Sequence, residues 1–446
     1  MKYLPTFLCF MFSIQVFSQA SIKGKVVIEE SDTPIAGASV FINSTSNGTV
    51  SDNNGNFELY NIPHGKYELI ISSVGYETIV YPFVYTQLPI QLKLMMKIKV
   101  KELKGVEVGG YEIQTWEQWG KYFLENFIGY TANPADCKIK NTGVIQFRYY
   151  KKQNKLIAIA DKPLIIENKA LGYKLKYQLE EFEINFKENS TLFLGYPFFE
   201  ELESNRNARE RKWASKRLQA YNGSMLHFMR SLNENRLKDE GFEVQRLRKE
   251  LNTEKLRIKA LYKANFTRQV DSNTNNRITI QIGSNGSILK DSARIILSAA
   301  DSIAYYERIL QQKDYLDIFA RQLLTSDSLI TIDSEGNKLL GFPDYLHIVF
   351  NKEIEDVGYL KFVAENRNPY FQQSTIFING ENQLIHIDSK GNYSPPQLVF
   401  STGYWAWSEK IANMLPLDYE KNPEPKKVDK QLKPIKPARF SKKKKT

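Results

Sequence analysis

Residues 34–77 read PIAGASVFINSTSNGTVSDNNGNFELYNIPHGKYELIISSVGYE, and this stretch decides the fold of the N-terminal part of the chain. Within it, the segment Lys66–Ser72 places Tyr67, Leu69 and Ile71 at alternate positions, which is the period of a half-buried strand. The run at 52–55, Asp-Asn-Asn-Gly, has the composition of a hairpin turn. Working outward, similar short segments lie at 21–28, 38–42, 49–51, 56–60, 66–72, 78–84 and 90–95. Seven short strands separated by turn residues predict a β-sandwich.

The same residues resemble a known family, the carboxypeptidase-regulatory-like module. The resemblance rests on Gly24-Lys25-Val26, the run from Pro34 to Val40, Gly48-Thr49, Asp52 to Gly55 with Phe57, Pro63 to Tyr67, and Val74 to Glu77. It implies a transthyretin-like sandwich of seven strands over residues 19–96. That family is frequent in the cell envelope of Bacteroidetes-type bacteria, often ahead of TonB-dependent outer-membrane receptors. The resemblance therefore also implies a non-catalytic domain that serves as a folding, docking or spacer module.

The zinc site of a carboxypeptidase is not encoded in this chain. Such a site needs a histidine, a glutamate three residues later and a distant second histidine. The chain has four histidines, at positions 64, 227, 347 and 386, and the residues three positions after them are Tyr67, Arg230, Phe350 and Ser389. We expect no peptidase zinc site, no other metal and no cofactor.

The N-terminus indicates export. Residues 1–18 combine Lys2, an apolar run from Leu4 to Phe17 and a small residue at Ser18, which is typical of a secretory signal peptide. We expect the mature protein in the periplasm or at the outer membrane, without a transmembrane span. Cys137 is then the only mature thiol, so no intramolecular disulfide is expected.

The larger part of the chain, residues 111–420, is expected to be an α+β domain with an antiparallel sheet, reached through a linker at 97–110. Trp116, Trp119, Phe123 and Phe127 recur at helical spacing and predict an amphipathic helix. A second long helix is expected at about 201–240. Strands are expected at 345–351, 359–363, 374–378, 383–387 and 397–401, with Asn379-Gly380 as a two-residue hairpin turn. Trp405 and Trp407 begin a closing helix that stops before Pro416.

Two pairs of residues carry groups that a hydrolase uses. Ser224 and His227 lie three apart on the expected helix, and His386 shares a strand face with Asp388. Neither pair has a third partner that the sequence identifies, and GxSxG, GxxxxGK[ST], GxGxxG, HExxH and CxxC are all absent. Side-chain neighbours at the spacing of Ser224 and His227 are common, and nothing in the sequence marks a nucleophile there. For His386 a hydrogen-bonded structural histidine is the favoured interpretation, and we expect no enzyme activity.

The net charge of +11 is concentrated at the C-terminus. Residues 421–446 hold ten lysines and Arg439 against Glu424 and Asp429, and end in the run Lys442, Lys443, Lys444 and Lys445. With four prolines and no apolar period, this tail is expected to be disordered. It is interpreted either as an attachment to anionic lipid, lipopolysaccharide or acidic protein, or as a solubilising end without a partner. The body is close to neutral and the chain is exported, so nucleic acid is not an expected partner.

These observations favour a non-catalytic envelope protein that binds or scaffolds another envelope component. The alternative is a glycan- or peptide-binding protein, since the chain contains 25 Tyr, 26 Phe and 5 Trp residues that can form stacking platforms. Trp405, Trp407 and the terminal lysines are the candidate binding residues. A hydrolase that uses His386, Asp388 or Ser224 is the least favoured of the three hypotheses.

Overall fold

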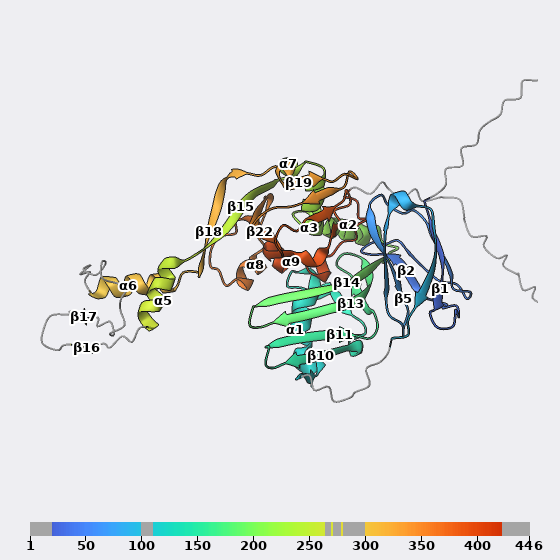
Figure 1. Cartoon of the computed structure of the whole chain (residues 1–446), viewed down its shortest axis with the longest axis horizontal. Helices are drawn as coiled ribbons and strands as arrows, with labels where there is room; N and C mark the ends of the chain where they lie inside the picture. The colour runs from blue at the N-terminus through green and yellow to red at the C-terminus, as the bar shows by residue number, and fades with distance from the viewer. Residues whose placement is uncertain (1–19, 100–109, 264–268, 271–277, 280–298, 422–446) are drawn as a thin grey trace, which may run out of the picture.

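The computed structural model describes residues 20–99, 110–263, 269–270, 278–279 and 299–421 (Figure 1). The predicted leader at 1–18, most of the predicted linker at 97–110, and Lys442, Lys443, Lys444 and Lys445 lie outside the described residues. Only Lys421 of the basic tail is described. Among the described helices, none is both long enough and apolar enough to cross a bilayer.

The N-terminal part is a sandwich of two sheets, with strand orders β4-β1-β7 and β3-β2-β5-β6. The strands are β1 (Ile22–Ile28), β2 (Ser39–Ile42), β3 (Gly48–Val50), β4 (Asn56–Leu59), β5 (Lys66–Ser72), β6 (Ile79–Val84) and β7 (Ile90–Met96). Their alternating apolar side chains meet between the sheets, where Val40, Phe57 and Leu69 are buried. The predicted seven-stranded sandwich is confirmed. Strand β1 pairs antiparallel with β4 and parallel with β7.

A second sheet of seven strands follows, with the order β8-β10-β11-β13-β12-β9 and β14 paired to β13. The strands are β8 (Glu112–Gln114), β9 (Cys137–Ile139), β10 (Ile145–Tyr150), β11 (Lys155–Ala160), β12 (Leu164–Asn168), β13 (Tyr173–Asn185) and β14 (Ser190–Glu201). The predicted amphipathic helix is α1 (Trp116–Phe127), which packs on this sheet. Its buried Phe123 ring lies 4.6 Å from that of Phe182, centroid to centroid. The same core buries Cys137, the free thiol.

The last third contains a five-stranded sheet, β18-β15-β21-β22-β25, and a four-stranded sheet, β19-β20-β23-β24. The first consists of β15 (Phe242–Leu251), β18 (Tyr315–Leu323), β21 (Tyr345–Ile354), β22 (Phe371–Ile378) and β25 (Val399–Gly403). The second consists of β19 (Ile330–Ile332), β20 (Lys338–Leu340), β23 (Ile385–Ile387) and β24 (Tyr393–Ser394). Helix α3 (Met225–Asn233) shares one core with both sheets, in which Phe228, Phe350 and Ile387 are buried.

The expected long helix at 201–240 is wrong, because the segment forms three helices. They are α2 (Asn207–Tyr221), α3 and α4 (Leu237–Glu240). Gly223 and Asn235 interrupt them with φ values of +70° and +56°, which a right-handed helix does not accommodate. Ser224 then caps α3 by accepting a hydrogen bond from the backbone N–H of His227.

Three expectations in the last third are also wrong. Residues 359–363 are not a strand but part of α8 (Val357–Phe362), which Asp356 caps by accepting from the N–H of Gly358. Asn379-Gly380 does not close a hairpin, because β22 and β23, on either side of it, belong to different sheets. The region 405–415 forms a short helix α9 (Tyr404–Ser408) and a single 3₁₀ turn at Ile411–Asn413, in place of one continuous helix.

The sandwich lies directly against the second sheet (Figure 1). The turn after β2 inserts between β14 and the segment that contains Leu417. Ser44 N–H donates to the carbonyl of Pro197 at 2.9 Å, and Leu417 N–H donates to the carbonyl of Ser44 at 2.7 Å. The side chain of Leu417 packs against the sandwich core, and the ring of Phe41 lies 5.2 Å from that of Phe198. The sandwich is therefore fixed to the larger region at two places, β14 and the segment at Leu417.

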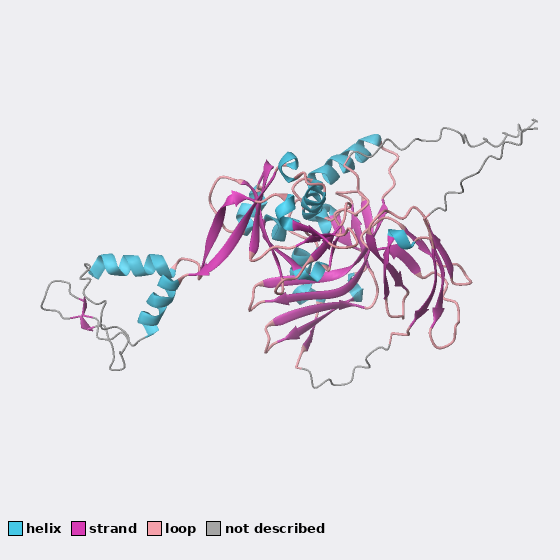
Figure 2. Ribbon diagram, turned by 45° about the horizontal axis from the view of Figure 1, so that its top comes forward, coloured by secondary structure: helices cyan, strands magenta, loops and turns pink. Residues whose placement is uncertain are grey.

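Strands β15 and β18 extend from the body as a two-stranded arm (Figures 1 and 2). The arm leads into two helices, α5 (Thr253–Lys263) and α6 (Ala299–Leu310), which project away from the sheets. Two short paired strands, β16 (Gln269–Val270) and β17 (Ile278–Thr279), are described between them. Helix α7 (Ser326–Leu329) brings the chain back to the body.

Candidate functional site

The five-stranded sheet has one face in the core and one face toward solvent. Successive side chains on a strand point to opposite faces, so Leu346, Ile348 and Phe350 of β21 enter the core while Tyr345 and His347 face outward. On β22 the same alternation buries Ile376 and turns Phe377 outward. The outward side chains form the surface that we call the aromatic face.

The aromatic face is defined by Phe319, Tyr345, His347, Phe377 and Phe400, which come from four of the five strands. The register places Phe319 opposite Leu247, and Leu247 opposite Tyr345. The ring centroids of Tyr345 and Phe377 are 5.3 Å apart, as are those of Phe377 and Phe400. The Phe319 ring packs edge-on against His347 at 5.0 Å. One row of aromatic side chains therefore crosses the whole sheet on its solvent side.

A hollow of about 410 Å³ opens beside this row. Its lining includes Lys249 of β15, Asp317 of β18, Thr375 of β22 and Thr402 of β25. The Lys249 ammonium lies 4.5 Å from the centroid of the Tyr345 ring, a cation–π distance. The volume lies within the range of small-ligand pockets, roughly 300–1,000 Å³. A ligand placed here would meet the Tyr315 ring together with hydroxyl, ammonium and carboxylate groups.

The structure places both candidate tryptophans in the interior. Trp405 and Trp407 are each 2% exposed, so neither ring is available to stack on a ligand. Trp405 packs against Phe228 in the core beneath the five-stranded sheet, and its indole N–H donates to the carbonyl of Gly223 at 2.6 Å. The residues of the aromatic face were not identified from the sequence. Alternate positions of β21 are apolar or aromatic on both faces, so the period of two does not say which face is exposed.

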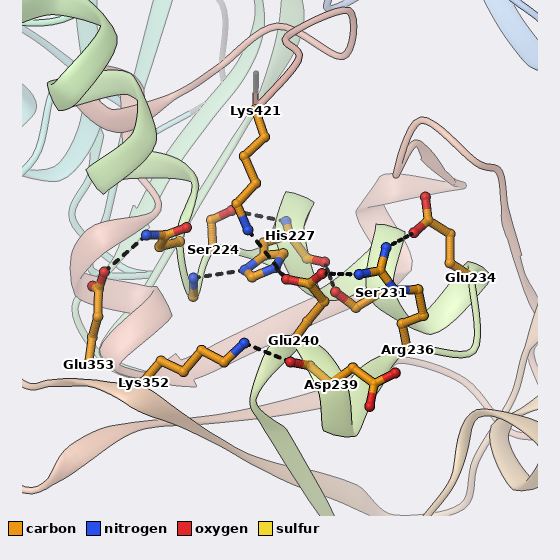
Figure 3. A network of polar contacts seen from close by, with 12 residues as sticks. Ser224, His227, Ser231, Glu234, Arg236, Asp239, Glu240, Lys352, Glu353 and Lys421 are labelled. Carbon is orange, nitrogen blue, oxygen red and sulfur yellow. Dashed lines mark hydrogen bonds and ion pairs between the residues drawn. The ribbon is translucent and has the colours of Figure 1, made fainter. Parts of the chain in front are cut away.

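The buried side chain of His227 belongs to a network of polar contacts, which Figure 3 shows. Its Nδ1 atom accepts a hydrogen bond from the Gly223 N–H at 3.1 Å, so the ring proton is on Nε2. That nitrogen donates to Oε2 of Glu240 at 3.1 Å. Glu240 in turn accepts hydrogen bonds from Arg236 at 2.7 Å and from Lys421 at 3.4 Å.

This geometry does not assemble a nucleophile from Ser224 and His227. The Ser224 hydroxyl oxygen accepts from the backbone N–H of His227 at 3.0 Å, and the ring of His227 does not reach it. Both ring nitrogens are already occupied, so the imidazole cannot act as a general base without breaking one of these bonds. His227 is 2% exposed and joins α3 to α4. Its role in the structure is to hold the two helices together.

We expect His227 to make the protein less stable in mild acid. Burial lowers the pKa of His227 to about 4, although hydrogen bonding to Glu240 opposes this; Lys421 and Lys352 also lower it. Between pH 6.5 and 4 the unfolded chain binds a proton at this position that the folded chain does not, so stability falls as the pH falls. The expected loss from this residue is roughly 3 kcal/mol.

Urea unfolding of the parent and of His227→Gln at pH 7.5 and pH 4.5 measures this loss. The variant is expected to lose less stability on acidification than the parent. Burial raises the pKa of Asp388 to about 6, so this residue titrates in the same pH range and makes the folded state more stable as the pH falls. The effect of His227 is therefore the difference between the stability losses of parent and variant, in which the contribution of Asp388 cancels. Equal losses in parent and variant would show that the burial of His227 does not control the acid response.

Among the hydrogen bonds of the described residues, none joins His386 to Asp388. Asp388 follows β23, and its Oδ1 atom accepts from the N–H groups of Lys390 and Asn392 at 2.8 and 3.0 Å. Its Oδ2 atom is buried and has no partner among the described residues. Both residues line a crevice of about 280 Å³ between the sandwich and the four-stranded sheet, together with His64. The described residues contain no group of three side chains placed to hold a metal ion.

Comparison with known proteins identifies the N-terminal part. A family model described as "CarboxypepD_reg-like domain" matches residues 22–108. The chain thus contains a carboxypeptidase-regulatory-like domain. This domain is regulatory and non-catalytic, and no catalytic family is indicated for the chain. No curated protein matches the sequence.

Two solved structures that align with parts of this chain have low TM-scores. One is a type II cohesin–X-dockerin complex from Acetivibrio cellulolyticus, with 21% identity over 20% of this chain and 65% of that chain and a TM-score of 0.16. Another is a putative membrane-associated protein of unknown function from Bacteroides fragilis, with 8% identity over 84% of this chain and 92% of that chain and a TM-score of 0.15. Scores at this level do not indicate a shared overall fold.

Proposed function

We propose that this protein is a non-catalytic, exported cell-envelope protein that binds or scaffolds another envelope component through the aromatic face of its five-stranded sheet. The observation that carries the proposal is the row of Phe319, Tyr345, Phe377 and Phe400 on the solvent side of the sheet. Aromatic side chains supply large contact areas at protein surfaces and are enriched at binding sites. A row of them across a sheet is a surface suited to a ligand or partner.

The side chains that could act in catalysis are already engaged in structural hydrogen bonds, which supports a binding function over a catalytic one. Ser224 caps a helix, and both ring nitrogens of His227 are hydrogen-bonded. The Asp388 carboxylate closes its own turn. The carboxypeptidase-regulatory-like domain adds a non-catalytic module to the same chain.

In this proposal the sandwich is a rigid support for the aromatic face. It is joined to the larger region through Ser44, Phe198 and Leu417, so it is not a freely tethered module. The leader at 1–18 would deliver the protein to the periplasm or outer membrane. The basic residues 421–446 would add electrostatic attachment to an anionic envelope component, weakened by salt within a Debye length of about 10 Å at 0.1 M.

Photo-cross-linking from the aromatic face tests the proposal. With p-benzoylphenylalanine in place of Phe377, we expect a discrete adduct in the envelope of the producing cells, identified by mass spectrometry as an envelope component. Tyr122 is the matched control, because it is also aromatic and is 47% exposed on helix α1, away from the five-stranded sheet. Absence of an adduct at position 377, or the same adduct from both positions, would remove the aromatic face from this role.

A glycan is the second candidate ligand, and the hollow beside the aromatic row favours it. Sugars stack their apolar faces on aromatic rings and hydrogen-bond their hydroxyls to neighbouring polar groups, and Thr375, Thr402 and Asp317 stand beside the rings. A glycan array with the purified protein is the test. A specific signal that falls about tenfold in Phe377→Ala and Phe400→Ala would favour a glycan ligand. A blank array would favour the scaffolding function.

A further inference from the structure

The edge of the five-stranded sheet is open at β18. Among the described residues this strand pairs with β15 alone, and it stands last in the strand order. Its large apolar side chains are 41–52% exposed, and they are Tyr315, Leu316, Ile318, Phe319 and Leu323. Soluble proteins usually protect such edges with proline, lysine or a covering segment. The nine residues of β18 include neither proline nor lysine.

The unused backbone groups of β18 can be assigned from its pairing with β15. Asn252 N–H donates to the Asp314 carbonyl at 2.9 Å, and Leu324 N–H donates to the Val244 carbonyl at 2.7 Å. Residues that bond to a given neighbour alternate along an antiparallel strand. Between Phe319 and Leu323 the strand takes four residue steps against two on β15, so residues 320–322 form a bulge, and the alternation seen up to Phe319 is found again at Leu323. The N–H and C=O groups that point away from β15 therefore belong to Tyr315, Asp317, Phe319 and Leu323.

We infer that β18 is a dimerisation strand, which pairs antiparallel with β18 of a second copy of this chain about a two-fold axis at Phe319. This axis sets the outward backbone groups of Phe319 against those of the same residue in the second copy. It also sets Tyr315 opposite Leu323, an aromatic residue opposite an aliphatic one. The pairing joins two five-stranded sheets into one continuous sheet of two copies.

Charge complementarity favours a second copy of this chain as the partner that pairs with β18. The strand reads Tyr-Leu-Asp-Ile-Phe-Ala-Arg-Gln-Leu, and its two charged residues, Asp317 and Arg321, stand two positions on either side of Phe319. In the antiparallel pair each Asp317 faces Arg321 of the other copy, so the contact forms twice. Opposite charges directly across a strand pair are favourable, and like charges are unfavourable. Arg321 is exposed and forms no ion pair with another described residue, so it is free to make this contact.

Charge reversal in the full-length chain tests the pairing directly. Analytical ultracentrifugation of the parent is expected to give twice the 51.7 kDa chain mass. Arg321→Asp places two aspartates across the axis and is expected to raise the dimer dissociation constant by about tenfold or more. Asp317→Arg is expected to do the same with two arginines. The double variant Asp317→Arg/Arg321→Asp exchanges the charges and is expected to restore the parent value.

Disulfide cross-linking provides a second, independent measurement. Paired residues in this register have Cα atoms about 5.5 Å apart, which a disulfide can span. Phe319→Cys is expected to form a covalent dimer under mild oxidation, while Val50→Cys, on an exposed strand of the sandwich, forms no covalent dimer. Cys137 is buried and does not compete. A monomeric parent at roughly 100 μM, an Arg321→Asp dimer as tight as the parent, or equal cross-linking of both cysteine variants would overturn the inference.

Discussion

Replacing Trp405 with alanine is expected to lower the free energy of unfolding by about 3–5 kcal/mol, because the change empties the centre of a core. The side chain is 2% exposed and packs on Phe228 at a ring distance of 5.5 Å. Its indole N–H is the donor to the buried Gly223 carbonyl, which alanine leaves without a partner. Urea unfolding of parent and variant, followed by circular dichroism, measures the loss.

Phenylalanine at the two tryptophan positions gives a matched comparison. Trp405→Phe breaks the hydrogen bond to Gly223, whereas the indole nitrogen of Trp407 has no hydrogen-bond partner among the described residues. We therefore expect Trp405→Phe to destabilise the protein more than Trp407→Phe. If Trp405→Ala kept the unfolding midpoint of the parent and lost only ligand binding, the ring would be a surface contact and the description of this core would be wrong.

Replacing Arg230 with alanine is expected to cost about 3–5 kcal/mol of stability. The guanidinium, on α3, donates to three backbone carbonyls, those of Lys390, Leu417 and Tyr419, each at 2.9 Å. The residue is buried, so its removal leaves these oxygens without equivalent donors. Arginine is suited to this position because its planar fork presents donors in several directions at once.

The consequence of losing Arg230 should extend to the sandwich. Residues 417–419 carry Leu417 into the sandwich core and Asp418 to the Ser46 N–H at 3.1 Å. Hydrogen exchange is therefore expected to rise in residues 417–419 and in the turn after β2. Arg230→Lys keeps the charge but has one donor group, so it is expected to recover only part of the loss. Unchanged exchange in both segments of Arg230→Ala would mean that the sandwich is held without this link.

The sandwich was predictable because its strands carry local signals. Alternation in Lys66–Ser72 and the turn at 52–55 each depend on a few consecutive residues, and the structure confirms strands and turn there. Helix α1 was predictable for the same reason, since its buried residues recur at helical spacing. In each case one element has one buried face, so the pattern in the sequence and the pattern of burial coincide.

The errors lie where tertiary contacts outweigh a local pattern. The segment at 201–240 has helical spacing throughout, but Gly223 and Asn235 break it so that α3 can turn into the core. Residues 359–363 have strand-forming side chains, but Asp356 caps a helix just before them. Trp405 and Trp407 are aromatic residues of a kind found in binding sites, and only the packing of α9 against β22 decides that they are buried.

The sequence by itself determined the sandwich, the amphipathic helix that follows it and the concentration of positive charge at residues 421–446, because each depends on residues close together in the chain. Only the tertiary structure decided which aromatic rings face solvent, which groups bond to the two ring nitrogens of His227 and which strand ends the sheet. Those properties depend on residues far apart in the sequence. Phe319, Tyr345, Phe377 and Phe400 lie on one surface because five strands pair in a particular register, and no single strand contains the information that fixes that register.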